Sequence, residues 1–431
     1  MEIGNKRNKF IKVAAIILLI LTTLIFLKDP GAGDLQSFWI KWANNANVYG
    51  VAEGFKANAR DYPPLVSLIL FCSLKVSKLF EISDFVAIKI CIFFFLLLTS
   101  FIFFIITRDL LSTVLLHLSL ILGSVALAYI DVLVFPFLIL SFWALKKHKL
   151  ILFSILFTIS FLIKWQPIII LPFIVIYIID INKLKEWKKI NFKELIIKIL
   201  SPAIIILIII ISIYGFRATR DSLILALSEK SFLSGNALNF NWILTHFLHV
   251  FQPDKFGSLV NGKALILKDI NIPITLTVTS KTLFILLYLL TCISFFKSKK
   301  SFENLLLYSI IGFFAYFSFN TGVHENHLIY AMVLSVFLYV ENKGHLYVTL
   351  ILILITNINM FLFYGYAGNK IYGDFDSIGF SRVIKNLDIA LVLSIFNVVF
   401  FLILWVLYVI LPIKQSIILY RQEKAKIKTV Q

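Results

Sequence analysis

The sequence predicts an all-α, polytopic transmembrane protein with about 12–14 spans. Hydrophobic residues make up 60% of the chain and charged residues 15%, and the mean hydropathy is +0.94. Apolar runs recur that are long enough to cross about 30 Å of hydrocarbon as helices. Short clusters of Lys and Arg separate these runs, as in the cytoplasmic loops of membrane proteins. We therefore interpret residues 1–431 as a single integral membrane domain.

The apolar runs give thirteen candidate spans, and basic clusters set their orientation. Basic residues at the N-terminus and in later clusters predict that both termini are cytoplasmic. Outer loops are then expected at residues 28–63, 215–275 and 364–385. The candidate spans are residues 10–27, 64–82, 84–107, 110–128, 129–145, 150–164, 166–180, 195–214, 278–296, 303–320, 327–341, 345–363 and 386–412.

The number of spans conflicts with this orientation. Two cytoplasmic termini require an even number of crossings, and thirteen is odd. We place the surplus between residues 84 and 145, as a short or broken pair of helices around Gly123 and Pro136. Discontinuous helices of this kind occur where a membrane protein lines a cavity.

The net charge of +18 excludes little by itself. Because the basic residues lie in short clusters between apolar segments, they indicate basic loops retained in the cytoplasm and argue against nucleic-acid binding. The three cysteines lie in apolar segments without pairing or metal-ligand spacing, so no disulfide framework is expected.

The first outer loop, residues 28–63, contains the strongest candidate residues. Asp34 and Asp61 would lie beside a membrane surface, where carboxylates are costly unless they face a protein-lined or wet cavity. Such a carboxylate can take a proton from an acceptor hydroxyl. Trp39 and Tyr62 are among the aromatic residues interleaved with them, and aromatic faces suit sugars. The alternative is a pair of solvated loop charges, followed by prolines that simply begin a helix.

Further polar residues are predicted on the same outer face. His324 and Glu325 stand where a span reaches the surface. Their spacing fits no structural zinc pattern, so donation to a phosphate is favoured over metal binding. The alternative is a polar cap at the membrane interface. Lys164 would be an interfacial cation, and with Arg217 it suggests an anionic partner. The alternative for Lys164 is ordinary snorkelling to the interface.

Three more positions complete the candidate set. Asp131 lies in a strongly apolar stretch, and burial of an isolated charge is expensive. It is therefore expected either to face the polar cavity, which we favour, or to cap a broken helix. Asn236 and Trp242, in SGNALNFNWIL, either bind a sugar or hold a loop turn. All these residues would collect on the face opposite the basic loops, which favours one site.

These residues resemble motifs of the GT-C superfamily of membrane glycosyltransferases that use polyprenyl-phosphate-linked sugars. GD followed by an aromatic-rich loop ending in DYPPL resembles the first loop of ER dolichyl-phosphate-glucose-dependent glucosyltransferases. HEN, beginning at His324, is similar to their HEK-type motif. LALAYIDVLVF and KWQP, beginning at Lys164, look like the GQxD and KPQP elements of bacterial polyprenol-dependent members, and NALNFNW resembles their Asn/Trp segment. The sequence departs from these patterns at Tyr129-Ile130, Trp165 and Asn326.

The resemblance implies a GT-C-like fold with a large first outer loop, and an inverting hexosyltransferase. Asp34 would be the general base, and Lys164, His324 and Arg217 would hold the donor phosphate. The residues expected to shape the acceptor and sugar site are Asp61, Tyr62, Trp39, Glu325, Asp131, Asn236 and Trp242. The expected partners are a polyprenyl-phosphate-linked sugar donor and a glycan or lipid-linked acceptor. No cofactor is implied; a divalent metal is compatible with the chemistry, but no ligand set indicates one.

Two other functions fit a lipid-linked substrate. A lipid-linked sugar transporter or flippase would place ionisable groups in mid-span and often shows inverted repeats, neither of which the sequence suggests. A surface polysaccharide polymerase or ligase would act on longer glycans. The abundance of Ile, Phe, Lys and Asn favours a prokaryotic plasma membrane.

Overall fold

The computed structural model of the chain describes residues 13–14, 16–28, 31, 33–58, 62–181, 186, 188, 190–228, 232–267, 272–365, 382–384 and 387–414. Asp61 and most of the predicted outer loop 364–385 lie outside these residues. The chain forms two compact units. Unit 1 comprises Met1–Ile168, Phe192–Lys230 and Met360–Phe380, and unit 2 comprises Ile169–Asn191, Ser231–Asn359 and Ser381–Gln431.

The protein is a helical, multi-pass membrane protein. Six helices within the described residues are long and apolar enough to cross a membrane: Asp84–Thr107, Phe192–Tyr214, Ile274–Lys297, Phe302–Phe319, Lys343–Tyr364 and Ile389–Lys414. Shorter apolar helices run over Ile16–Lys28, Leu110–Ala126, Leu150–Ile163, Gln166–Ile179 and Ile329–Glu341. Many large aliphatic side chains on these helices are exposed, as expected for surfaces that face lipid.

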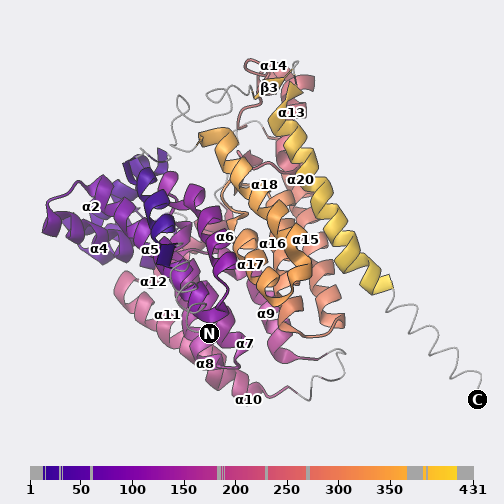
Figure 1. The fold of residues 1–431 in the computed structure, drawn as a ribbon. Helices are drawn as coiled ribbons and strands as arrows, with labels where there is room; N and C mark the ends of the chain where they lie inside the picture. Colours follow the sequence, from indigo (N-terminus) through magenta and orange to yellow (C-terminus); the bar gives the residue numbers. More distant parts are fainter. Residues whose placement is uncertain are drawn as a thin grey trace, which may run out of the picture. The chain divides into compact units, whose positions relative to one another are not determined.

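In unit 1, several short helices connect the first apolar segment to α4 (Pro64–Phe80), and apolar helices joined by short turns follow (Figure 1). The first apolar segment ends in η1 (Ile25–Lys28), and the short helices of the first loop are η2 (Leu35–Trp39), α2 (Ile40–Tyr49) and α3 (Val51–Asn58). The others are α4 (Pro64–Phe80), α5 (Asp84–Thr107), α6 (Leu110–Ile121), η3 (Leu122–Ala126), η4 (Ile130–Leu133), α7 (Phe135–Lys146), α8 (Leu150–Ile163), α10 (Phe192–Leu195), η7 (Ile196–Leu200), α11 (Ser201–Tyr214) and α12 (Phe216–Ser228).

The predicted interruption around Gly123 and Pro136 is confirmed. The α-helix α6 gives way to the π-helical turn η3, and Ala128 then adopts a left-handed conformation with φ of 58°. A 3₁₀ turn, η4, carries Asp131 before α7 begins. Pro136 lies in the first turn of α7, where its missing N–H costs no helical hydrogen bond.

Helices α2 and α4 lie side by side in unit 1 (Figure 1). The ammonium groups of Lys75 and Lys78 on α4 lie 3.4 and 3.1 Å from Asn47 Oδ1 on α2. Phe55 on α3 packs edge-on against Tyr214 of α11, with ring centroids 5.3 Å apart. The helices of the first loop therefore form one packed layer together with α4.

Unit 2 is built around the strongly buried helices α16 (Phe302–Phe319) and α17 (Ile329–Glu341). The 3₁₀ turn η5 (Gln166–Ile170) leads into it. Its other elements are α9 (Leu171–Ile179), β1 (Ser234–Gly235), α13 (Phe240–Phe251), α14 (Pro253–Phe256), α15 (Ile274–Lys297), β2 (Val323–His324), η9 (Lys343–His345), α18 (Leu346–Tyr364, whose last turn belongs to unit 1), β3 (Val383–Ile384), β4 (Leu387–Asp388), α20 (Ile389–Trp405) and η10 (Val406–Ile410). Strand β1 pairs in parallel with β2, and β3 pairs antiparallel with β4.

Candidate functional site

The start of the first loop, residues 28–63, is fixed against the turn between η3 and η4 in unit 1. Gly31 has φ of 75°, and a Cβ built on it would lie 3.0 Å from Ala128 Cβ. Trp39, at the end of η2, donates its indole N–H to the Ala128 carbonyl over 3.1 Å. A glycine at position 31 therefore serves both the left-handed backbone and the close approach of the two segments.

Three aromatic rings of the loop pack edge to face. The ring centroids of Trp39 and Trp42 are 5.1 Å apart, and that of Tyr62 lies 5.3 Å from the first and 5.2 Å from the second. Edge-to-face contacts of this kind contribute about 0.5–1.5 kcal/mol beyond the area that they bury. They hold the end of the loop, at Tyr62, against its beginning.

A buried ion pair lies beside this aromatic group. Lys164 Nζ is 2.6 Å from Asp131 Oδ1, and the two side chains are only 4% and 1% exposed. The same ammonium lies 5.2 Å from the centroid of the Tyr62 ring, in cation–π geometry. We call Asp131, Lys164, Tyr62, Trp39 and Trp42 the Lys164 cluster. The structure thus brings together four residues that were predicted separately, namely Asp131, Lys164, Tyr62 and Trp39.

Asp34 lies one turn before Trp39, immediately ahead of η2. Its neighbour Leu35 is fully buried, whereas Asp34 is half-buried. Because Trp39 anchors the same turn to Ala128, the position of the Asp34 backbone is tied to the segment that leads into Asp131. A half-buried carboxylate on a fixed turn has the access that a general base requires.

Two further groups of unit 1 were not among the predicted site residues. Lys89 of α5 is completely buried and donates to the Phe26 carbonyl over 2.7 Å. Its sequence signal is a lone cation inside the apolar run DFVAIKICIFFF. Trp165, next to Lys164, has a buried indole N–H with no hydrogen-bond partner among the described residues. Both are polar groups held inside a unit built mainly of apolar side chains.

Arg217 is placed differently from the other candidates in unit 1. Its side chain on α12 is 90% exposed, and its Nε lies 3.7 Å from Asp221 Oδ2. The structure therefore does not place it in the Lys164 cluster. Its assignment to the donor phosphate stays a prediction.

In unit 2 the backbone holds His324 in place. Val323 and His324 form β2, in which His324 pairs with Gly235 of β1, and Asn236 forms an isolated bridge to His324. A Cβ on Gly235 would lie 2.8 Å from His324 Nδ1, so only glycine leaves room for the imidazole there. We call residues 322–327 the His324 turn.

The other polar residues of the His324 turn are buried around it. Glu325 Oε2 lies 3.8 Å from His324 Nδ1, too far for a hydrogen bond but close enough for attraction when the imidazole is protonated. His327 is bonded through Nδ1 to the Tyr316 hydroxyl over 3.1 Å, and its backbone N–H donates to the His324 carbonyl. The turn thus presents one half-exposed imidazole above a buried carboxylate.

Asparagines of the SGNALNFNWIL segment take part in hydrogen bonds that join this loop to other segments of unit 2. Asn239 accepts from the Trp242 N–H at the start of α13 and donates to the Phe317 carbonyl. The Asn236 carbonyl accepts from Asn359 Nδ2 over 2.7 Å. These bonds place Asn236 where its backbone can pair with His324.

Trp242 on α13 is fully buried beneath the ion pair of Arg382 and Asp388. The Arg382 guanidinium lies 5.8 Å from its ring centroid and forms two hydrogen bonds to Asp388, of 2.9 and 3.0 Å. His246, one turn further along α13, is also buried, and this burial lowers its pKa below the usual 6.5. Trp242 therefore packs beneath an ion pair.

Among the described residues, no three or more His, Cys, Asp or Glu side chains gather as a metal site would require. The sequence matches no protein-family model and no curated protein.

Proposed function

We propose that this protein is an inverting glycosyltransferase that moves one hexose from a polyprenyl-phosphate donor to an acceptor hydroxyl. The observation that carries the proposal is the Lys164 cluster, with the Asp34 turn anchored beside it through Trp39 and Ala128. It combines a half-buried carboxylate, a buried cation and aromatic rings within one unit. These are the groups that such a transfer needs for the proton, the phosphate and the fixed geometry.

The reaction follows from the chemistry of the two substrates. Asp34 accepts the proton of the acceptor hydroxyl, whose oxygen attacks the anomeric carbon opposite the phosphate. The bond between that carbon and the phosphate oxygen breaks, and the electron pair leaves with the polyprenyl phosphate. Configuration at the carbon is inverted. A base contributes about 10²–10⁴-fold to such a rate, and positioning and phosphate stabilisation supply the rest.

Lys164 is suited to meet the phosphate because it is already fixed. An ammonium group has three N–H donors, and a single hydrogen bond joins Lys164 to Asp131. Among the described residues this bond uses one of the three donors, and we propose that a phosphate oxygen accepts from another. The ion pair and the Tyr62 ring prevent the side chain from reorienting. A preorganised charge of this kind loses little free energy in reorganisation when the leaving group departs.

The remaining assignments are proposals that rest on the resemblance. His324 and Arg217 would contact the donor phosphate, and Glu325, Asn236 and Trp242 would shape the sugar site. Asp61 would do the same from outside the described residues. We further propose that the site faces the outside of a prokaryotic plasma membrane, with both termini in the cytoplasm.

The decisive experiment is sugar transfer by the purified protein from a panel of polyprenyl-phosphate sugars. We expect one donor to yield product, and we expect Asp34→Asn to lower the rate by about 10²-fold or more because the base is lost. Unchanged thermal unfolding of the variant would show that it folds. An equally active variant would remove Asp34 as the base. Movement of lipid-linked sugar across reconstituted vesicles without transfer would support a transporter instead.

The packing of α4 leads to a proposal about the number of spans. Lys75 and Lys78 tie α4 to α2 of the first loop. Lys89, near the start of α5, bonds to Phe26 at the end of the first apolar segment. A crossing by α4 would carry the start of α5 to the opposite face. We therefore propose that α4 lies along the outer face, which leaves twelve crossings and removes the odd count without a surplus pair between residues 84 and 145.

Cysteine accessibility tests this arrangement. In a variant with Cys72, Cys91 and Cys292 replaced by serine, we expect Glu81→Cys to react with an impermeant maleimide in intact cells. Tyr49→Cys, in the first loop, is the positive control, and Lys147→Cys, in the turn after α7, should react only after permeabilisation. Protection of Glu81→Cys in intact cells, with labelling after permeabilisation, would show that α4 crosses the membrane.

A further inference from the structure

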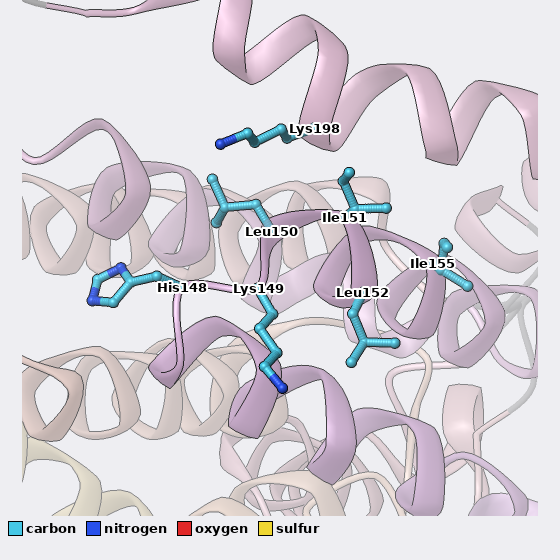
Figure 2. Close-up of a pocket in the computed structure, with 7 residues that line it drawn as sticks. All are labelled: His148, Lys149, Leu150, Ile151, Leu152, Ile155 and Lys198. Carbon is cyan, nitrogen blue, oxygen red and sulfur yellow. The ribbon is translucent and has the colours of Figure 1, made fainter.

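A groove opens in unit 1 between the start of α8 and the π-helical turn η7 (Figure 2). Its volume is about 430 Å³. Four aliphatic side chains of α8 line it, together with His148, Lys149 and Lys198. It therefore joins an apolar wall to basic groups.

The two walls of the groove are tied together by a side-chain bond. Ser154 of α8 donates to the Ile199 carbonyl of η7 over 2.5 Å. A π-helical turn leaves backbone carbonyls without their usual α-helical partners, and such turns are frequent at functional sites. Most residues of α8 that line the groove precede Ser154 in the sequence. The bond thus fixes the spacing of the walls without filling the space between them.

The basic groups differ in how firmly they are held. Lys198 pairs with Glu194 over 2.6 Å, but both side chains are well exposed, and exposed pairs contribute little. Lys198 can therefore exchange this partner for another anion. Lys149 instead makes a cation–π contact, with its Nζ 4.9 Å from the centroid of the Trp143 ring. Figure 2 shows His148 and Lys198 on either side of Leu150, while the Lys149 side chain points away from Lys198.

We propose that this groove binds one anionic phospholipid of the membrane. One acyl chain lies along Leu150, Ile151 and Ile155, and the phosphate lies between His148 and Lys198. The basic turn at residues 146–149 leads directly into the apolar helix α8. The groove therefore lies at the boundary between lipid headgroups and acyl chains, where a phospholipid presents both. A lysine or arginine that faces the headgroups at a membrane surface favours anionic over neutral lipids by about fivefold, and a neutral His148 can donate a hydrogen bond to the phosphate. This inference is independent of the glycosyltransferase proposal.

Lipid retention by the purified full-length protein tests the inference. Phosphatidylglycerol and phosphatidylcholine with identical acyl chains are supplied in equal amounts, and bound lipid is counted by native mass spectrometry. We expect the wild type to retain phosphatidylglycerol preferentially. The variant with both His148→Ala and Lys198→Ala should lose this preference by about fivefold, the contribution of one lysine at a membrane surface. Lys149→Ala is the matched control and should retain it.

A variant that fills the groove distinguishes the contribution of the acyl chain to lipid retention from that of the headgroup. Ile155→Trp should lower the retention of both lipids, because the indole occupies the space of the chain. Equal retention of the two lipids by the wild type would overturn the proposal, as would a preference that survives in the His148 and Lys198 double variant. All these residues are at least partly exposed, and the melting temperature of each variant shows that it is folded.

Discussion

The Lys164 cluster and the His324 turn hold their polar side chains in different ways. In the cluster, side chains from separate segments hold one another, as in the 2.6 Å bond between Lys164 and Asp131. In the turn, His324 is fixed by strand pairing to Gly235 and by the bridge to Asn236. A buried ion pair fails when one side chain is removed, whereas a backbone pairing fails only when the chain path changes. The two regions should therefore respond to different substitutions.

The largest effect is expected from breaking the ion pair. Asp131→Ala leaves the Lys164 ammonium buried without its counter-charge, and we expect the free energy of unfolding to fall by about 3–5 kcal/mol. Denaturant titration of the purified protein measures this change. Replacing both residues, with Asp131→Leu and Lys164→Met, should restore much of the loss, since no charge then stays buried.

The matched control for this experiment is Glu53→Ala, which removes the carboxylate of the exposed pair with Lys56. An exposed pair contributes at most about 1 kcal/mol. If Asp131→Ala lowers the free energy of unfolding no more than Glu53→Ala does, the buried ion pair does not hold the Lys164 cluster together, and the comparison with the His324 turn fails.

A smaller effect on stability is expected from Gly235→Ala in β1, the strand that pairs with the His324 turn. The added methyl would lie 2.8 Å from His324 Nδ1, so the imidazole or the strand must move. Overpacking of this kind costs about 1–3 kcal/mol, and displacement by about 1 Å at a reacting site lowers rates by about 100-fold. We expect transfer activity to fall more than stability. Gly33→Ala, with no atom within 4 Å of its added methyl, should leave both almost unchanged.

The smallest effect is expected from His246, near Asp388, His249 and Arg382. Burial lowers its pKa below 6.5, and Asp388 opposes this in part. The unfolded chain therefore binds a proton at a higher pH than the folded protein does. Stability contributed by the neutral imidazole is present above about pH 6.5 and declines as the pH falls toward the lowered pKa. His246→Gln should reduce the loss of stability between about pH 7.5 and about pH 5.5; an unchanged pH profile would contradict this assignment.

The helices could be predicted from sequence because membrane spans depend on local composition. Apolar runs such as 84–107 and 303–320 coincide closely with α5 and α16. The break before Pro136 was also visible, because a glycine, an aspartate and a proline interrupt an apolar stretch. Local composition did not predict the proposed placement of helix α4 along the outer face. Its sequence resembles a span, while its packing against α2 depends on contacts between distant residues.

The candidate site could be predicted only in part. Asp131 and Lys164 were each expected on the outer face, but their ion pair joins residues 33 positions apart and depends on how α7 and α8 pack. Trp39 and Trp242 were predicted to contact a sugar, yet both are buried. A tryptophan has the same sequence signal whether its ring faces a cavity or supports one from behind. Lys89 was missed because a single cation in a span carries no partner in its local sequence.

The ion pair also has a consequence for biogenesis. Asp131 and Lys164 stand at the two open ends of the hairpin formed by α7 and α8, whose closed end is the turn at residues 147–149. Moving either charge alone through the hydrocarbon centre costs about 2.5–3.5 kcal/mol. If the two helices enter the bilayer together as a hairpin, the opposite charges travel side by side as a neutral pair. In that case α7 integrates only once α8 has been synthesised.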